Sequence, residues 1–106
     1  MSRVLYYKNN ETIIKSGKLE KRMYIILEGA VAITLTDGND HFPVANLKKG
    51  DFFGEISLFI NAPRSATAKA MGDVKLAFID NEEQLKSFLI KNPFFAAKMV
   101  SILAQR

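Results

Sequence analysis

The chain has 106 residues, of which 48% are hydrophobic and 25% are charged, a composition typical of a folded domain and unlike that of a disordered chain. This length corresponds to one domain, so we expect residues 1–106 to form a single unit without an internal linker. The absence of cysteine excludes disulfides and thiolate metal sites, whereas the net charge of +4 is compatible with an anionic small molecule or with nucleic acid.

The first 80 residues contain short apolar runs separated by turn residues, which predicts strands. The dense turn signal Asp37-Gly38-Asn39-Asp40 indicates a hairpin, and Gly72-Asp73 indicates another turn. The predicted strands are 13–14, 24–29, 31–36, 41–47, 66–70 and 74–79. Short, evenly spaced strands favour a β-barrel or sandwich, here over residues 4–80 or so.

The hydrophobic period becomes helical after the last strand. Asp80 followed by Glu83 is typical of a helix cap, which predicts a helix over about 81–91. Asn92-Pro93 indicates the start of a second helix, whose apolar arc is wide and includes Phe95, Met99 and Ile102 on one stripe. The surface from Phe94 to Leu103 therefore predicts either plain core packing or contact with a second copy or a host protein.

Residues 53–68 have the features of an anion site. Gly54 allows a close approach of backbone to a ligand, and Glu55-Ile56-Ser57-Leu58 can form a helical turn with free N–H groups. Arg64 follows a proline that fixes the chain direction, which would hold its guanidinium near the same N–H groups. By themselves such glycine-glutamate and proline-arginine pairs are common and usually indicate a turn with a surface ion pair.

The same segment resembles the phosphate-binding cassette of cyclic-nucleotide-binding domains. The cassette pattern is Phe-Gly-Glu, a branched apolar residue, a small residue and Leu, then a spacer and Pro-Arg-X-Ala-Thr, and residues 53–67 match every element. Further blocks of the family pattern occur in order at Ile14 to Gly17, 24–29, 47–55 and Asn92-Pro93. The chain is therefore identified as a member of the catabolite-activator-like and protein-kinase-regulatory-subunit-like jelly-roll family.

The resemblance implies a mainly β fold with C-terminal helices. It consists of a double-stranded β-helix (jelly-roll) barrel of about eight short strands, a short cassette helix and two C-terminal helices over about 81–106. By the same resemblance the last helix is truncated, and the helix that precedes the barrel in many relatives is absent or very short.

The resemblance also implies the roles of the site residues. Arg64 would bind the exocyclic oxygens of a cyclic phosphate, and Glu55 would accept a hydrogen bond from the ribose 2′-hydroxyl. A hydroxyl at Ser65 permits cGMP without requiring it, so we favour cAMP over cGMP. Thr67 is as well explained as a plain strand residue. Residues expected to contribute mainly backbone are Gly54, Ile56, Ser57 and Ala66.

We therefore predict a regulatory, non-enzymatic module that binds cAMP or cGMP, has no cofactor or metal, and repositions its C-terminal helices as Leu58 is drawn in. The alternative is a degenerate domain that serves as a dimerisation or protein-interaction module without nucleotide. An enzyme acting on cyclic nucleotides would need a metal cluster or general base that the sequence does not indicate.

Other partners are disfavoured by the sequence. His41 is the one histidine and lies beside a hairpin turn, which disfavours a metal-dependent cupin. The basic run Lys15, Lys18, Lys21 and Arg22 is interpreted as a solvated loop, and no recognition helix follows, so we expect no direct nucleic-acid contact. No stretch approaches the ~20 apolar residues of a membrane helix and no signal peptide is evident, which predicts a cytoplasmic protein without membrane insertion.

Overall fold

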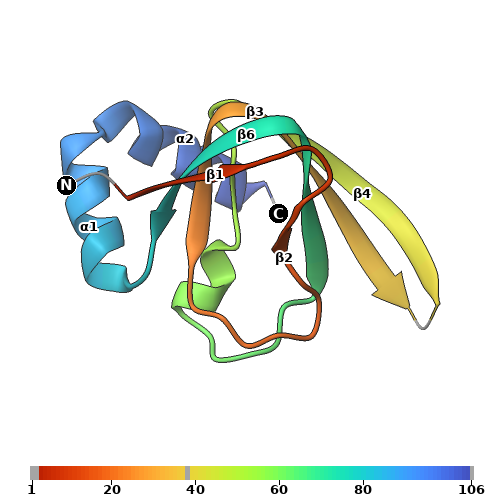
Figure 1. Ribbon diagram of the computed structural model, residues 1–106. Helices are drawn as coiled ribbons and strands as arrows, with labels where there is room; N and C mark the ends of the chain where they lie inside the picture. The colour runs from red at the N-terminus through yellow and green to blue at the C-terminus, as the bar shows by residue number, and fades with distance from the viewer. Residues whose placement is uncertain (1–2, 38, 106) are drawn as a thin grey trace.

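The computed structural model describes residues 3–37 and 39–105 (Figure 1). Strands come first along the chain and the two α-helices come last, as the sequence predicted. The elements are β1 (Val4–Tyr7), β2 (Thr12–Ile14), β3 (Met23–Asp37), β4 (Asp40–Lys48), β5 (Phe52–Phe53), the 3₁₀ helix η1 (Glu55–Leu58), β6 (Ala66–Ile79), α1 (Glu82–Lys91) and α2 (Pro93–Ala104).

The strands pair antiparallel in the order β1-β6-β3-β4, with β2 also on β6 and β5 also on β3. β3 and β6 are long and bent, so each contains two of the separately predicted strands. The β3–β6 register shifts on either side of Glu28, and Gly72 of β6 has a positive φ of 75°. If each bent strand is counted as two, the described strands number eight, in agreement with the jelly-roll prediction.

The bend of β3 depends on Gly29. This residue has a φ of 89°, a conformation that glycine adopts without the strain of a Cβ. A Cβ at this position would also collide with the main-chain carbonyl oxygen of Asp73 on the adjacent strand. Glycine is therefore required both by the backbone conformation and by the close approach of β6.

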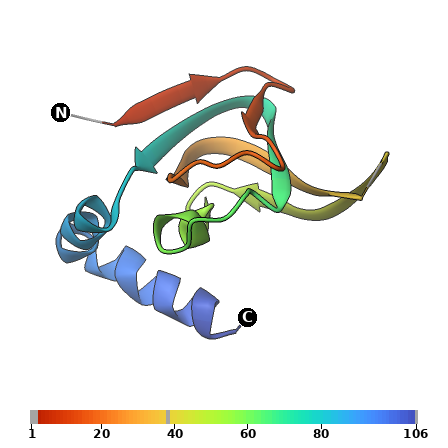
Figure 2. The same ribbon diagram turned by 90° about the horizontal axis from the view of Figure 1, so that it is seen from below.

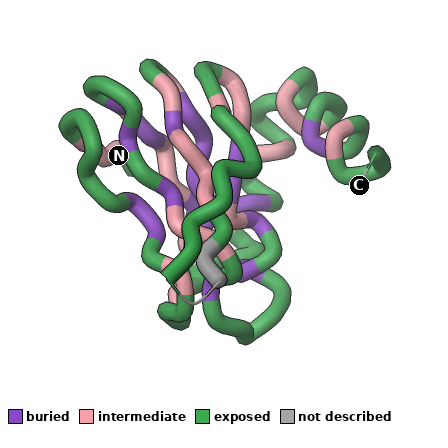
Figure 3. The backbone as a smooth tube through the Cα atoms, turned by 90° about the vertical axis from the view of Figure 1, so that its right-hand side faces the viewer, coloured by how far each residue is buried: buried purple, intermediate pink, exposed green. Residues whose placement is uncertain are grey.

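The two faces of β3 contribute to two different cores. Tyr24, Ile26 and Val31 face the barrel core, which also contains Phe53 and Leu76. Successive strand residues point to opposite faces, so the neighbouring Met23 and Ile25 face the helix-side core. That second core includes Phe52, Leu58, Ile79, Leu85 and Met99. Buried stretches therefore follow the strands, while much of α2 remains exposed (Figure 3).

Both helices lie at one end of the sheet, and the β3–β4 hairpin projects from the other end (Figures 1 and 2). The predicted cap of α1 was wrong by one residue: Asn81 is the N-cap and its side chain accepts the N–H of Gln84 at 2.9 Å. The shift puts Asp80 outside the helix, where its side chain is free to form ion pairs. Along α2 the predicted stripe is confirmed, since Met99 is buried and Phe95 and Ile102 pack beside it.

The predicted alternation of buried and exposed residues holds only in the inner part of the β3–β4 hairpin. Val31 is buried and Leu47 packs against the barrel core, but Leu35 and Phe42 are largely exposed. The register pairs β3 with β6 as far as Leu35, and the outer end of the hairpin extends past β6 (Figure 1).

Within the described residues, no single helix is long and apolar enough to cross a membrane. α1 and α2 together meet the criteria of length and composition, but a bend of 119° separates them.

Candidate functional site

A cavity of about 370 Å³ lies between η1, the segment that follows it and the sheet. Its wall includes every residue that the sequence analysis proposed as a ligand-binding residue. These are Gly54, Glu55, Ile56, Ser57, Arg64, Ser65 and Ala66, and Thr67 also lines the cavity. The fold thus brings together the cassette's two halves, which the exposed loop from Phe59 to Pro63 separates in sequence.

Gly54 sets the start of the cassette helix. Its φ of 80° turns the chain from β5 into η1, which confirms the predicted helical turn at residues 55–58. A Cβ on Gly54 would lie 3.0 Å from both the Arg22 carbonyl oxygen and Nη1 of Arg64, which is closer than side chains normally approach. The glycine therefore leaves room for the Arg64 guanidinium beside the backbone.

Ser57 ties η1 to the start of β3. Its hydroxyl lies 2.8 Å from the carbonyl oxygen of Gly54 and 3.1 Å from that of Arg22, and it accepts the N–H of Arg22 at 3.2 Å. These bonds occupy the hydroxyl, and the main-chain N–H of Ser57 also donates to the Gly54 carbonyl at 3.3 Å, so Ser57 serves mainly to hold the turn of η1.

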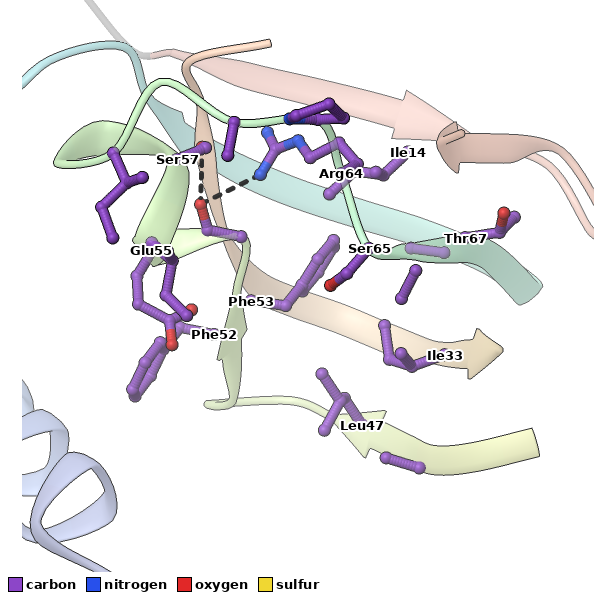
Figure 4. Close-up of a pocket in the computed structure, with 18 residues that line it drawn as sticks. Ile14, Ile33, Leu47, Phe52, Phe53, Glu55, Ser57, Arg64, Ser65 and Thr67 are labelled. Atoms are coloured by element: carbon purple, nitrogen blue, oxygen red, sulfur yellow. Dashed lines mark hydrogen bonds between the residues drawn. The ribbon is translucent and has the colours of Figure 1, made fainter. Parts of the chain in front are cut away.

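Arg64 is a buried charged group of the site, held by hydrogen bonds to main-chain carbonyls. It is 8% exposed, and its guanidinium donates to the Gly54 carbonyl at 3.1 Å (Figure 4). It also donates to the Arg22 carbonyl at 2.5 Å. Its Nε is buried without a hydrogen-bond partner among the described residues. Burial lowers the pKa of Arg64, and the charges of Glu20, Tyr24 and Glu55 oppose that shift only in part.

The other predicted residues occupy distinct parts of the wall. Glu55 is buried at the start of η1, whereas Ile56 and Ser65 are exposed at the rim. Ala66 is the first residue of β6. Thr67 accepts the N–H of Ser16 at 3.1 Å, so its hydroxyl links β6 to the loop after β2.

Sequence reasoning did not identify the apolar side of the cavity. Ile14, Ile33, Ala45 and Leu47 come from three different strands and converge on it (Figure 4 labels three of them). Ile33 carried a signal, because its alternation with Ala32 and Thr34 predicted a strand with one face turned to solvent and the other inward. Which residues meet across the strands depends on the β3–β4 register and was not readable from the sequence.

The basic loop is solvated as predicted at Lys15, Lys18 and Lys21, whose side chains are exposed, but its main chain contacts the cassette. Gly17 donates its N–H to the Arg64 carbonyl at 2.8 Å, and Arg64 donates its own to the Lys18 carbonyl at 2.8 Å. The side chain of Arg22, at the end of this loop, forms an ion pair with Asp80 at 2.7 Å. Long-range pairing of two loops therefore holds the Arg64 backbone.

In residues 3–37 and 39–105, no three histidine or carboxylate side chains come together in a group that could hold a metal ion.

Comparisons with known proteins agree with this geometry. A family model described as the cyclic nucleotide-binding domain matches residues 4–92. The type II regulatory subunit of cAMP-dependent protein kinase from Drosophila melanogaster is 41% identical over 75 residues, which are 70% of this chain and 20% of that protein. The regulatory subunit from Dictyostelium discoideum is 36% identical over 80 residues, which are 72% of this chain and 24% of that protein.

Solved structures show the same fold. The catabolite activator protein of Thermus thermophilus matches 99% of this chain and 49% of its own chain, with a TM-score of 0.82 and 28% identity. The EAL enzyme Bd1971 in its form bound to cAMP and cyclic-di-GMP matches 81% of this chain and 23% of its own, with a TM-score of 0.74 and 31% identity. The chain thus spans about a fifth of the Drosophila relative, and it belongs to the cyclic nucleotide-binding domain family.

Proposed function

We propose that this domain binds a 3′,5′-cyclic nucleotide, with the cyclic phosphate on Arg64 and the backbone of η1. The observation that carries the proposal is the buried Nε of Arg64, which has no partner among the described residues. A buried donor without a partner costs about 1–3 kcal/mol, more when it is charged. A phosphate oxygen would provide the missing acceptor, and its negative charge would favour the charged form of Arg64.

The chemistry of the remaining wall fits the rest of such a ligand. A cyclic phosphodiester has one negative charge and two free oxygens, which suits a guanidinium together with backbone N–H groups. Glu55 is the carboxylate of the wall and would accept the ribose 2′-hydroxyl, while Ile33 and Leu47 offer apolar surface to the base. The volume of about 370 Å³ lies in the usual range for small-ligand pockets, about 300–1,000 Å³.

We further propose that cAMP is preferred over cGMP. The relatives with the greatest similarity quoted above are named for their dependence on cAMP, whereas Bd1971 is known in a form bound to cGMP as well. Ser65 carries a hydroxyl at the exposed rim of the cavity, a position that permits guanine. The proposed preference is therefore one of degree, with both nucleotides able to bind.

The proposed output of binding is a movement of the C-terminal helices. Leu58 is the last residue of η1 and is already buried in the helix-side core with Leu85 of α1 and Met99 of α2. A ligand that changes the position of η1 would therefore act on the packing of both helices. In this proposal the domain regulates by differential contacts in two states rather than by catalysis.

The test is calorimetric titration with cAMP and cGMP, with 5′-AMP as the ligand control. We predict saturable binding of both cyclic nucleotides, tighter for cAMP, and little binding of 5′-AMP, whose extra charge and bulk do not suit the cavity. Arg64→Ala should weaken binding by about 2–5 kcal/mol, or ~30-fold to a few thousand-fold, because it removes a buried charge-assisted contact.

The matched control is Lys86→Ala, which removes one positive charge from the exposed surface of α1 outside the cavity. It should bind like the wild type. If wild-type protein bound neither cyclic nucleotide, the alternative of a degenerate interaction module would replace the proposal.

A further inference from the structure

The main chain of Arg22 holds two groups of the proposed phosphate site at once. Its carbonyl oxygen accepts a hydrogen bond from Nη2 of Arg64 at 2.5 Å and lies 3.1 Å from the hydroxyl of Ser57. Its N–H donates to the same Ser57 hydroxyl at 3.2 Å. The orientation of one peptide segment, at the entrance to β3, therefore determines where the Arg64 guanidinium lies.

The side chain of Arg22 is held by Asp80 and Phe78, and it also forms a side-chain hydrogen bond with Tyr24. Its Nε donates to Oδ1 of Asp80 at 2.7 Å, and its guanidinium carbon lies 4.2 Å from the centre of the Phe78 ring. Asp80 is itself anchored, because its main-chain N–H donates to the side-chain oxygen of Gln84 in α1 at 2.8 Å. The β3–β6 ladder, which pairs Tyr24 with Phe78, keeps both ends of this arrangement in register.

The surroundings of Arg22 and Arg64 affect the pKa values of the two guanidinium groups in opposite directions. Burial lowers the pKa of Arg22, but the hydrogen bond and charge of Asp80, together with Tyr24, raise it more. The pKa of Arg64 is instead lowered, chiefly by burial. The carboxylate of Asp80 thus compensates the charge of Arg22, whereas at Arg64 burial outweighs the opposing charges of Glu20, Tyr24 and Glu55.

We propose that Arg22 is a positioning residue for the phosphate site: its side chain, held by Asp80 and Phe78, orients the carbonyl that aims the Arg64 guanidinium. This inference rests on the proposed function, since positioning matters only if Arg64 receives a ligand. Removal of the side chain would allow the peptide at residue 22 to rotate, so Arg64 would lose a fixed acceptor without losing its own charge.

Arg3 offers a matched control within the same cluster. Its Nη1 donates to the other oxygen of Asp80 at 3.0 Å, and its guanidinium carbon lies 5.9 Å from the centre of the Phe78 ring. Its carbonyl, however, accepts the N–H of Phe78 at 3.0 Å rather than a group of the site. Arg3→Ala therefore removes a comparable ion pair and ring contact without touching the Arg64 acceptor.

The first experiment compares the affinity for cAMP of Arg22→Ala, Arg22→Lys and Arg3→Ala. Arg22→Ala should bind about tenfold more weakly, the size expected for coupled neighbours in one hydrogen-bond network, while Arg3→Ala should bind like the wild type. Arg22→Lys retains a cation for Asp80 and should recover part of the loss. In the Arg64→Ala background the Arg22→Ala change should have no further effect, because it acts through Arg64.

A second measurement separates positioning from general stability. Replacement of one or the other exocyclic phosphate oxygen of cAMP by sulfur gives two diastereomers that a fixed guanidinium should distinguish. Arg22→Ala should bind the two with more nearly equal affinity, whereas Arg3→Ala should keep the wild-type ratio even if its melting temperature falls. Equal losses of affinity in Arg22→Ala and Arg3→Ala, or an unchanged ratio in Arg22→Ala, would overturn the inference.

A third measurement needs no nucleotide and so distinguishes the two proposals. The Nε–H resonance of Arg64 in ¹⁵N-labelled protein should be shifted or broadened by Arg22→Ala and unaffected by Arg3→Ala. If wild-type protein bound no cyclic nucleotide, the proposed function would fail, and this resonance would still decide whether Arg22 fixes Arg64. If nucleotide bound normally but the resonance was unchanged in Arg22→Ala, only the positioning role would fail.

Discussion

The two faces of β3 are both buried, but they are covered by different kinds of structure. On one face Tyr24 and Ile26 belong to the barrel core, which strands enclose and backbone hydrogen bonds hold in register. On the other face Met23 and Ile25 belong to the helix-side core, which α1 and α2 close by side-chain packing. One face of the strand thus packs within a hydrogen-bonded scaffold, and the other packs against helices held by side chains.

Fewer contacts hold α2 to the sheet than hold the strands to one another. Phe95 contacts Phe52 edge to face at a centroid distance of 5.8 Å, and Lys98 donates to the Gly50 carbonyl at 2.7 Å. The neighbouring Phe94, by contrast, is 92% exposed. A helix held by one stripe and one lysine is easier to displace than a strand paired along its length. The cavity therefore lies on the face of the hydrogen-bonded scaffold, and the proposed movement lies on the other.

The largest expected effect is in the barrel core. Leu76→Ala should lower the free energy of unfolding by about 2–5 kcal/mol, because it leaves a cavity where the surrounding strands cannot collapse. Leu76 is completely buried, which places it among the most sensitive positions. Chemical denaturation measures the loss; a change under 1 kcal/mol would mean that the barrel core is as adaptable as the helix layer.

A smaller effect is expected from the equivalent deletion on the helix side. Met99→Ala should cost about 1–2 kcal/mol, because α2 can move to close the gap. Hydrogen exchange should show faster opening of α2 with little change in β3 and β6. The comparison would break if exchange accelerated equally in the strands, since the two layers would then unfold as one unit.

The smallest expected effect on stability appears only at high pH and arises from Tyr24 in the barrel core. Burial, with the charge of Tyr7 adding to it, raises the pKa of Tyr24. The folded state therefore keeps the phenolic proton of Tyr24 at pH values where the unfolded chain has lost it. The contribution of Tyr24 to stability is complete below about pH 10, its pKa in the unfolded chain, and is lost as the pH rises through its pKa in the folded state.

Tyr24→Phe should remove part of this alkaline loss of stability and change little at neutral pH. Burial also raises the pKa of Tyr7, which partly packs against the same core, so some pH dependence should remain. Denaturation curves at pH 8 and above pH 10 measure the difference. An alkaline loss of unchanged size in Tyr24→Phe would assign it to other groups.

Much of the fold and the cassette could be read from local patterns. The spacing of Gly54, Glu55 and Arg64 predicted a shared site, and the structure places all three on one cavity. Glycines marked the bends correctly, but the strands on either side of Gly29 and Gly72 were predicted as separate elements. Hydrogen bonding to a neighbouring strand continues through such a bend, and a single sequence does not reveal that neighbour.

The sequence by itself determined the order of strands and helices, the turn at Gly54 and the residue types of the cassette. Those features depend on backbone preferences and hydrophobic periods that act over a few residues. Only the tertiary structure decided that Arg22, 42 residues from Arg64 in sequence, would hold its guanidinium and turn its own charge to Asp80. Such contacts depend on strand register and loop packing, which the whole chain sets together.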